Sequence, residues 1–338
     1  MGKKIGVGTL ALSRKIFVAG HGNCVGKFEE DGRLAGRFDN VITDEYYGEK
    51  TFELAEMKFQ KTALASAAAH AGVAVKKLEA LAAGDLLNQC IASGYSVRNN
   101  GVPFIGLYGA CSTMALSILT AGLVIESGFA DIAGAMTSSH FCSAERQFRN
   151  PLEYGGQRPP SAQRTVTGAA AVILSAQKND GVRIKEVTPG RVVDFDITDI
   201  NNMGGAMAPA AVDTLSAYFT DTATTPDQYD LIVTGDLGYF GREILRDMMA
   251  QRGLAMGDQY NDCGMMIYDN ERQDTHAGGS GCGCSGTVLT AYILPEMEKG
   301  NLKNVLFCAT GALMSPTSVM QNQSIPGVAH LIHLVKEA

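Results

Sequence analysis

The segment Val102-Pro-Phe-Ile-Gly-Leu-Tyr-Gly-Ala-Cys-Ser-Thr-Met-Ala-Leu116 runs from an apolar, strand-like stretch directly into the start of a helix, with Cys111 at the junction. The helix is predicted from Ser112 to about Ser127. At a helix N-terminus, free backbone N–H groups and the helix dipole lower the pKa of a thiol and attract anions. Cys111 is therefore either a nucleophile or part of an anion pocket, or it is a small buried thiol that fills the turn, as buried cysteines often do.

Three blocks around this junction recur later in the chain in the same order. The paired blocks are Leu78–Leu86 with Tyr229–Leu237, Ala110–Leu116 with Gly283–Leu289, and Asp131–Thr137 with Asn304–Thr310. Each series reads as strand, helix start and strand, which favours an internal duplication. We therefore expect an N-terminal half over residues 1–180 and a C-terminal half over residues 181–338, packed together as one body.

Strand-like runs alternate with helices through both halves, which is typical of α/β folds with mostly parallel sheets. The predicted strands are residues 80–84, 102–108, 131–135, 166–175, 182–187, 231–234 and 305–309. The predicted helices are residues 51–71, 112–127, 209–219, 242–250 and 285–298. Pro209 is expected in the first turn of its helix, where proline is favoured. The preceding apolar segment, Met203–Ala208, is either a mobile flap or the start of that helix.

Composition narrows the possible functions. Of the 338 residues, 46% are hydrophobic and 19% are charged, which indicates a packed globular protein. The formal net charge of −7 has the wrong sign for a surface that binds nucleic acid. The sequence shows neither a membrane-spanning apolar stretch nor a signal peptide, so we expect a cytosolic protein. Without a secretory context, the eight cysteines are expected to be reduced, and Cys282-Gly-Cys284 alone does not make a zinc site.

The junction Gly109-Ala-Cys-Ser-Thr113, inside a duplicated α/β chain, resembles the nucleophile elbow of the thiolase-like superfamily, which includes ketoacyl synthases and thiolases. Matches along nearly the whole chain resemble more closely the family of stage V sporulation protein AD. The matching segments are Ala83–Gln89, Gly109–Thr113, Thr137–His140, Ala144–Arg149, Glu153–Gly156, Thr165–Gly168, Met207–Ala210, Thr234–Leu237, Ala277–Cys282 and Ala309–Leu313.

This resemblance implies a duplicated, five-layered αβαβα fold with mostly parallel sheets and some antiparallel strands, and it implies a homodimer. It also implies binding of dipicolinic acid, or its calcium chelate, by the soluble subunit of the spore dipicolinate channel. That subunit would act in uptake during sporulation and release at germination. It would be cytoplasmic and peripheral to the forespore or spore inner membrane, held there by integral membrane subunits. No cofactor or metal is implied, and calcium enters only with the ligand.

The sequence departs from the catalytic relatives at two positions. Their cysteine works with a histidine and with a second His, Asn or Cys from the C-terminal half. The strand end that would carry the histidine is Thr234-Gly-Asp-Leu237, and the loop that would carry its partner is Ala277–Cys284. Neither supplies an imidazole in the matching place, so a binding module is favoured. Two alternatives remain: an acyltransferase or thiolase using Cys111 with Cys282 or Cys284, and a structural subunit with a vestigial pocket.

Eleven residues are expected to bind the ligand, on the resemblance and on their places at predicted strand ends. They are Cys111, His140, Asp85, Asn88, Gln89, Gly168, Ala169, Asp236, Ser280, Gly311 and Ser315. His140 either bonds a carboxylate or tunes the thiol, or it caps the following loop. Asp85 and Asp236 occupy matching places in the two halves, where each caps a helix, stays partly protonated, or orients donors such as Asn88 and Gln89.

Two further sets of charged or titratable residues were weighed as ligands. The cluster of Arg146, Arg149, Arg158 and Arg164 either binds the ligand's carboxylates through guanidinium forks or ties a long loop to a partner subunit. The remaining histidines are His21, His70, His276, His330 and His333. Of these, only His276, just before the glycine-rich loop, is placed where it could approach the pocket; the others have no partner that the sequence identifies.

Overall fold

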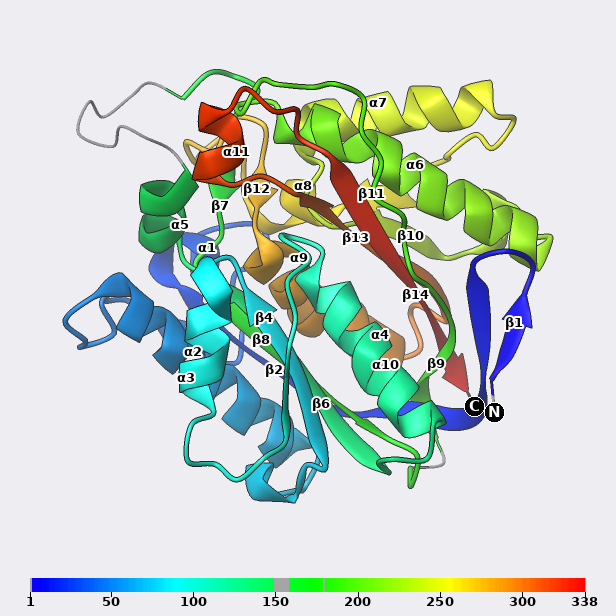
Figure 1. Cartoon of the computed structure of the whole chain (residues 1–338). Coiled ribbons are helices and arrows are strands. Elements are labelled where there is room, and N and C mark those ends of the chain that lie inside the picture. Colours follow the sequence, from blue (N-terminus) through cyan, green and yellow to red (C-terminus); the bar gives the residue numbers. More distant parts are fainter. Residues whose placement is uncertain (1, 149–157, 179, 338) are drawn as a thin grey trace.

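Two sets of five strands follow the same order in the two halves of the chain. The computed structural model describes residues 2–148, 158–178 and 180–337 (Figure 1). The strands are β1 (Lys3–Ile5), β2 (Thr9–Gly26), β3 (Val41–Ile42), β4 (Ala80–Asp85), β5 (Phe104–Gly106), β6 (Ile132–Ser139), β7 (Arg164–Thr165), β8 (Gly168–Ser175), β9 (Gly181–Thr188), β10 (Leu231–Thr234), β11 (Tyr260–Asp262), β12 (Gly279–Ser280), β13 (Asn304–Ala312) and β14 (Gly327–Glu337).

The helices complete the alternating pattern. They are α1 (Lys27–Glu30), α2 (Phe52–His70), α3 (Ile91–Ser96), α4 (Thr113–Glu126), α5 (Phe141–Phe148), α6 (Met203–Thr222), α7 (Gly238–Gln251), α8 (Cys263–Ile267), α9 (Cys282–Val288), α10 (Leu294–Glu298) and α11 (Pro316–Met320). A single π-helical turn, η5 (Leu289–Ile293), joins α9 to α10. Short 3₁₀ turns are η1 (Val75–Lys77), η2 (Asn88–Cys90) and η4 (Pro226–Gln228).

The first half has the strand order β5-β4-β6-β8-β2, and the second half repeats it as β11-β10-β13-β14-β9. In each set the strands at the outer end pair parallel, and the two strands nearest the middle run antiparallel to their neighbours. β2 and β9 pair antiparallel and join the two sets into one sheet. The recurring sequence blocks thus occupy equivalent places: β4 matches β10, β6 matches β13, and α4 matches α9.

Helices form three layers around these strands. α2 covers the outer face of β2 and β8, while α6 packs against β13 and β14 on the far side of the molecule (Figure 1). Between the two sets of strands lie α4 and α9. Because α4 contacts β4 and β6 on one side and β13 and β14 on the other, its sequence is apolar around most of its circumference. The α/β class and the layered thiolase-like arrangement are confirmed.

The predicted start of one helix is wrong. α6 begins at Met203, so Pro209 lies inside the helix and not in its first turn. The side chain of Asn202 accepts a hydrogen bond from the Gly205 amide at 3.2 Å and caps the helix. The segment Met203–Ala208 is therefore the first turns of α6 rather than a separate flap. Proline disfavours a helix interior because it lacks an N–H group, which is why the sequence points to Pro209 as a start.

The strand β2 was not predicted, and its glycines explain why. Gly20 and Gly22 weaken the strand pattern, yet α2 lies directly over them. A Cβ at Gly22 would come within 2.5 Å of the Ala67 amide nitrogen. Glycine is needed there because the helix and the strand approach too closely for a side chain.

Candidate ligand pocket at the Cys111 elbow

The chain turns sharply between β5 and α4 and places Cys111 at the inner end of a small cavity. Ala110 holds the left-handed conformation, with φ at 48°. The Ser112 hydroxyl donates to the Gly109 carbonyl at 2.6 Å, and the Thr113 hydroxyl donates to the Ala110 carbonyl at 2.5 Å. These local hydrogen bonds fix the turn, so the position of the thiol is set by the elbow itself.

β13 packs directly against this elbow through Gly311. A Cβ at Gly311 would lie 2.4 Å from the Gly109 carbonyl oxygen and 3.2 Å from the Cys111 amide nitrogen. Gly311, which was expected to bind the ligand, thus meets the elbow backbone and is not in the cavity lining.

Asp236, which follows β10, faces the Cys111 thiol. Its carboxyl accepts hydrogen bonds from the Gly281 amide at 2.9 Å, the Thr310 hydroxyl at 2.9 Å and the Ser280 hydroxyl at 3.1 Å. Its negative charge also acts on the Cys111 thiol. The sequence-based grouping of Cys111, Asp236 and Ser280 thus corresponds to one cluster in space.

The environment of Cys111 opposes ionisation. Burial, followed by the negative charge of Asp236 and the neighbouring Cys282, raises the pKa of the Cys111 thiol well above its ordinary value. Burial likewise raises the pKa of Asp236 to about 6. The helix N-terminus was expected to lower the thiol pKa, and this expectation is wrong because burial and the adjacent carboxyl outweigh the helix dipole. Cys111 is therefore a protonated thiol at neutral pH.

The cavity in front of Cys111 has a volume of about 40 Å³ and is mostly apolar. Its lining consists of Leu86, Tyr108, Ala110, Cys111, Ala144, Glu145, Phe148, Thr165, Met203, Ser280, Ala312 and Met314. Among these residues the hydroxyls of Tyr108 and Thr165 offer hydrogen-bond donors, whereas that of Ser280 already donates to Asp236. Ligand pockets usually measure several hundred cubic ångströms. A ring-sized ligand would therefore enter only after side chains such as Met203, Met314 and Phe148 move aside.

The two cysteines of the glycine-rich loop differ in their surroundings. The Cys282 thiol donates to the Ser138 carbonyl at 2.9 Å and belongs to the same buried cluster as Cys111, Leu86 and Ala144. The Cys284 thiol lies 3.7 Å from the Gly235 carbonyl. Burial raises the pKa of both thiols well above the ordinary value. All eight cysteines are free, as the sequence predicts.

Asp85 is a structural cap rather than a second copy of the Asp236 arrangement. It accepts hydrogen bonds from the Leu87 amide at 2.9 Å, the Ser93 amide at 2.8 Å and the Ser93 hydroxyl at 2.6 Å. These contacts close the loop between β4 and α3. Asn88 and Gln89, which Asp85 was expected to orient, lie exposed on that loop and outside the cavity lining.

A second buried carboxyl, Glu56 of α2, lies close to Asp85 and was not predicted. The hydroxyls of Ser138 and Ser143 donate to its two oxygens at 2.8 Å and 2.9 Å. Burial, together with the negative charge of Asp85, raises the pKa of Glu56 to about 8. The sequence offers only the two serines on β6 and α5 as hydrogen-bond donors. Their pairing with Glu56 on α2 could not be inferred, because α2 is distant from them in the chain.

His140 lies away from the cavity. Its Nε2 is 2.9 Å from the Glu45 carbonyl oxygen, and its Nδ1 accepts from the Cys142 amide at 3.2 Å. Its ring packs beside Phe52 and Phe59. Burial lowers the pKa of His140, so the ring is neutral and caps the loop before α5.

Three other residues that were expected to bind the ligand also have structural roles instead. Gly168 begins β8, where a Cβ would lie 2.9 Å from the Thr287 side chain. Ala169 is fully buried in a core cluster with Cys24 and Phe59. The Ser315 hydroxyl accepts from the Ser318 amide at 3.1 Å and caps α11. None of the three is in the cavity lining described above.

The arginines that were expected to bind carboxylates have partners within the chain. Arg146 pairs with Glu53, and Arg158 lies 3.1 Å from an Asp274 oxygen. Arg164 lies 3.9 Å from the centroids of both the Phe28 and the Phe141 rings. Arg149 and the predicted motif Glu153–Gly156 lie outside the described residues. His276 pairs with Asp274 at 2.9 Å and is likewise not in the cavity lining.

Solved structures with the same fold identify the class. A cerulenin-bound variant of Xanthomonas campestris OleA aligns with a TM-score of 0.60 and 15% identity, covering 96% of this chain and 97% of that one. For 3-oxoacyl-[acyl-carrier-protein] synthase III from Aquifex aeolicus VF5, the TM-score is 0.57 at 12% identity, covering 95% of this chain and 99% of that one. At such identities the likeness shows the fold alone. The repeated strand order and the cysteine elbow thus define a thiolase-like protein.

Sequence comparison identifies the family within this class. The family model described as Stage V sporulation protein AD matches residues 6–335. Stage V sporulation protein AD of Bacillus subtilis (strain 168) is 42% identical over 328 residues, covering 97% of this chain and 96% of that protein. The chain belongs to the stage V sporulation protein AD family. Across the described residues, every helix is too short or too polar to cross a lipid bilayer.

Proposed function

We propose that this sporulation-family protein binds dipicolinic acid, or its calcium chelate, in the cavity at the Cys111 elbow and does not transform it. The supporting observation is that the titratable group acting on Cys111 is the buried carboxyl of Asp236. In the catalytic relatives that the sequence resembles, an imidazole near the cysteine takes up its proton. Asp236, with a pKa of about 6, is ionised at neutral pH, and its negative charge raises the pKa of the thiol and so disfavours the thiolate that a nucleophile needs.

The lining suits a flat ring better than it suits isolated charges. Apolar side chains from Leu86, Phe148, Met203 and Met314 surround the space in front of Cys111. The lining also holds the hydroxyl-bearing side chains of Tyr108 and Thr165, which can donate hydrogen bonds to a carboxylate. The lining residues include no Lys or Arg, and Glu145 is among them. The two negative charges of fully ionised dipicolinate would meet no positive side chain among these lining residues. The calcium chelate or a partly protonated ligand therefore fits the proposal best.

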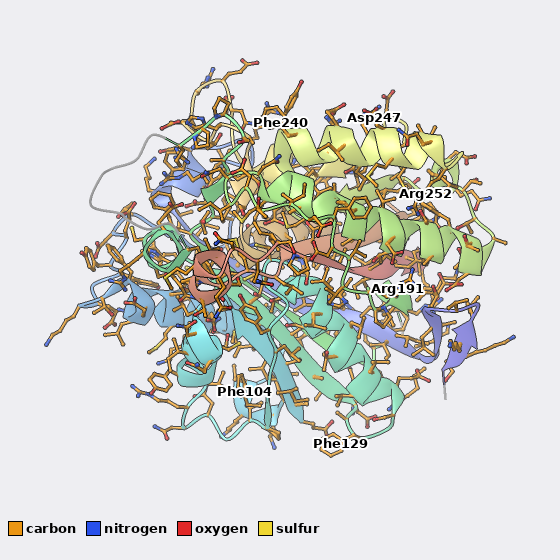
Figure 2. The ribbon with its side chains drawn as sticks, turned by 45° about the horizontal axis from the view of Figure 1, so that its top comes forward. Phe104, Phe129, Arg191, Phe240, Asp247 and Arg252 are labelled. Carbon is orange, nitrogen blue, oxygen red and sulfur yellow. The ribbon has the colours of Figure 1, made fainter. Side chains whose placement is uncertain are left out.

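The proposed cellular role follows from family membership. The protein would act as the soluble subunit of the spore dipicolinate channel, in uptake during sporulation and release at germination. It would associate with integral membrane subunits at the forespore or spore inner membrane. A homodimer is supported by β5, which ends the sheet and exposes Phe104 to the extent of 40% (Figure 2).

Calorimetric titration of the purified protein with dipicolinate tests the proposal. The titration is run with and without calcium, and benzoate serves as the monocarboxylate control. Ala144→Leu narrows the cavity from α5, and Cys142→Leu, on the same helix but outside the lining, is the matched control. We expect one site per chain, weak benzoate binding, and loss of binding in Ala144→Leu and in Cys111→Trp only. Undiminished binding in both narrowed variants would place the ligand elsewhere.

The second candidate function is acyl transfer, favoured by one observation. Cys111 and Cys282 lie in the same buried cluster beside the cavity, as a nucleophile and a second cysteine would in a thiolase-type site. Incubation with acyl-coenzyme A followed by mass measurement of the intact protein separates the two functions. A stable acyl adduct on Cys111 would support the enzyme, and an unmodified thiol is the result expected for the binding protein. If neither dipicolinate nor the acyl group binds, the pocket is vestigial and the subunit structural.

A further inference from the structure

Two histidines and one glutamate from three separate elements meet far from the Cys111 cavity. His21 lies on β2, His70 is the last residue of α2, and Glu298 is the last residue of α10. One donor atom from each lies within 4.8 Å of the other two. The sequence alone identifies no partner for His21 or His70, and the structure brings the two together. The sequence separation of the three residues hides a contact that only the fold creates.

The backbone explains why His70 lies at this point. β2 pairs with β9 only over Leu10–Phe17, so at His21 it has a neighbouring strand, β8, on one side only. His70 covers the open edge: its Nδ1 lies 3.2 Å from the His21 carbonyl oxygen. The same nitrogen lies 3.5 Å from the His21 amide nitrogen, so the shorter contact is the one to the carbonyl, and it is satisfied when Nδ1 carries the proton and donates to that carbonyl. The lone pair then lies on Nε2, which is the arrangement that metal-binding histidines commonly show.

The buried, unpaired ring nitrogens of His21 are the strongest indication that this place binds an ion. The side chain is 6% exposed, and neither ring nitrogen has a hydrogen-bond partner among the described residues. Nε2 lies 3.5 Å from an oxygen of Glu298 and forms only a loose ion-pair contact. Buried polar atoms without partners are uncommon in native proteins and call for an explanation. The two rings lie 4.6 Å apart between centroids, close enough to share one ion.

We propose that His21, His70 and Glu298 bind a divalent transition-metal ion of the zinc class, with a water molecule as the fourth ligand. Two imidazole nitrogens and one carboxylate oxygen form a familiar zinc ligand set. Calcium prefers six to eight oxygen ligands, so this is not a calcium site. The proposal is independent of the dipicolinate pocket.

Binding an ion requires only a small movement of the donor atoms, and the two exposed side chains, His70 and Glu298, make it. Zinc–ligand bonds of about 2.0–2.2 Å place tetrahedral ligand atoms roughly 3.4 Å apart. The donor atoms must therefore approach one another from separations of up to 4.8 Å. His21 is fixed within the strand, whereas His70 and Glu298 are exposed and can rotate towards it.

The charges around the three residues are compatible with a cation. Glu298 contributes the one carboxylate of the group. Lys178 opposes a bound cation, yet its ammonium group is directed to the Val18 carbonyl at 3.3 Å. A bound ion would connect β2 and α2 of the first half with α10 of the second.

Zinc titration of the full-length protein, freed of metal with a chelator, tests the proposal. Calorimetry gives the affinity, cobalt(II) absorption reports tetrahedral nitrogen and oxygen ligation, and thermal unfolding reports stabilisation. His70→Gln and Glu298→Gln remove exposed ligands and should leave the fold intact. The matched controls are His276→Gln and Glu296→Gln, the second of which lies on the same short helix as Glu298.

We expect one zinc ion per chain, a higher unfolding temperature with zinc, and no such effect with calcium. Removing a single metal ligand should weaken binding at least about 100-fold, since even outer-shell changes cost 10–100-fold. The controls should bind like the original protein. Equal zinc affinity in both ligand variants and controls would overturn the proposal and assign the ion to the cysteines. Absence of zinc binding to the original protein would overturn it as well.

Discussion

Asp236 combines a hydrogen-bonding role with an electrostatic one. Its oxygens receive the Gly281 amide and the hydroxyls of Ser280 and Thr310, which fixes the loop after β12 against β13. The negative charge of the same carboxyl disfavours ionisation of the Cys111 thiol. The two roles can be separated, since an amide keeps the size of the side chain and removes its charge.

Asp236→Asn should make Cys111 more reactive. Removing the carboxylate lowers the pKa of the thiol, although burial still holds it above the ordinary value. We expect alkylation of Cys111 by iodoacetamide at pH 8 to become severalfold faster, as followed by peptide mass spectrometry. Cys142, which is more exposed, serves as the internal reference. Unchanged alkylation of Cys111 would mean that Asp236 does not control the thiol.

Glu56 gives the protein a predictable response to pH. Its pKa is about 8 in the folded state against an ordinary value of 4.5. The folded state therefore holds more protons than the unfolded state between these values, and its stability falls as the pH rises through this window. Glu56→Gln replaces the protonated carboxyl with a neutral amide, which the Ser138 and Ser143 hydroxyls can still approach.

We expect Glu56→Gln to flatten the decline in unfolding free energy between pH 5 and about pH 8. Urea unfolding at several pH values in this range measures the effect. Asp236, with a pKa of about 6, contributes in the same direction and remains in the variant, so some slope should persist. A variant whose stability declines as steeply as that of the original protein would show that Glu56 titrates normally.

Of the residues predicted to bind the ligand, Cys111 and Ser280 line the cavity, and Asp236 and Gly311 lie directly behind them. All four could be named because each lies at a strand end beside the elbow or in its repeat. The lining from Tyr108, Phe148, Met203 and Met314 could not, because these side chains converge from separate segments of the fold. His140 was misassigned because a histidine at a strand end can turn to either side of the sheet, and here it turns towards Phe52.

Because β13 packs closely against the elbow, we expect one added methyl group at Gly311 to lower the unfolding free energy. Gly311→Ala would bring its Cβ within 2.4 Å of the Gly109 carbonyl oxygen, so the elbow or the strand must shift. We expect a loss of about 1–3 kcal/mol in unfolding free energy, together with weaker dipicolinate binding. Chemical denaturation measures the first effect and calorimetry the second.

The control for this change is Gly94→Ala in α3. Nothing lies within 4 Å of a Cβ at Gly94. Alanine in a helix interior is better than glycine by roughly 0.5–1 kcal/mol, so this variant should be neutral or slightly more stable. If the two variants behave alike, the tight contact at Gly311 is not important for stability.

Several helices and strands were predicted close to their observed bounds, whereas two long antiparallel strands were missed. The prediction for β10 matches its bounds, and those for α2, α4 and β9 differ by a residue at each end. The Thr51 hydroxyl accepts from the Leu54 amide and caps α2. β2 and β14 were missed because their partners lie far away in the sequence. A local sequence pattern indicates the conformation that a segment prefers by itself. β2 and β14 instead depend on pairing with strands that are distant in the sequence.

The two halves share a central layer, which leads us to expect that neither folds alone. α4 belongs to the first half but packs on β13 and β14, and β2 pairs with β9. Residues 1–180 produced alone would expose the apolar side of α4 and remove the β9 partner of β2 along Leu10–Phe17. We expect no cooperative thermal transition for this fragment by near-ultraviolet circular dichroism, and a single transition for the full chain. A cooperative transition in the fragment would make the halves independent domains.

A second cavity is the main alternative binding site for dipicolinate. It measures about 480 Å³ and is lined in part by Arg191, Asp213, Asp221 and Arg252 beside α6. Figure 2 shows Arg191 and Arg252 on the same side of the molecule, near α6. Arg191 pairs with Asp213 at 2.5 Å, so its charge is already balanced. By charge and size alone, however, this cavity is the obvious competitor for a dianion.

The crystal structure of the protein in complex with dipicolinate distinguishes the two cavities directly. We expect density for the ligand ring beside Cys111, with one carboxylate near the hydroxyls of Tyr108 and Thr165 and with Met203 or Met314 displaced from the cavity. Ligand density at Arg191 and Arg252, with the Cys111 cavity unchanged, would contradict the proposed site.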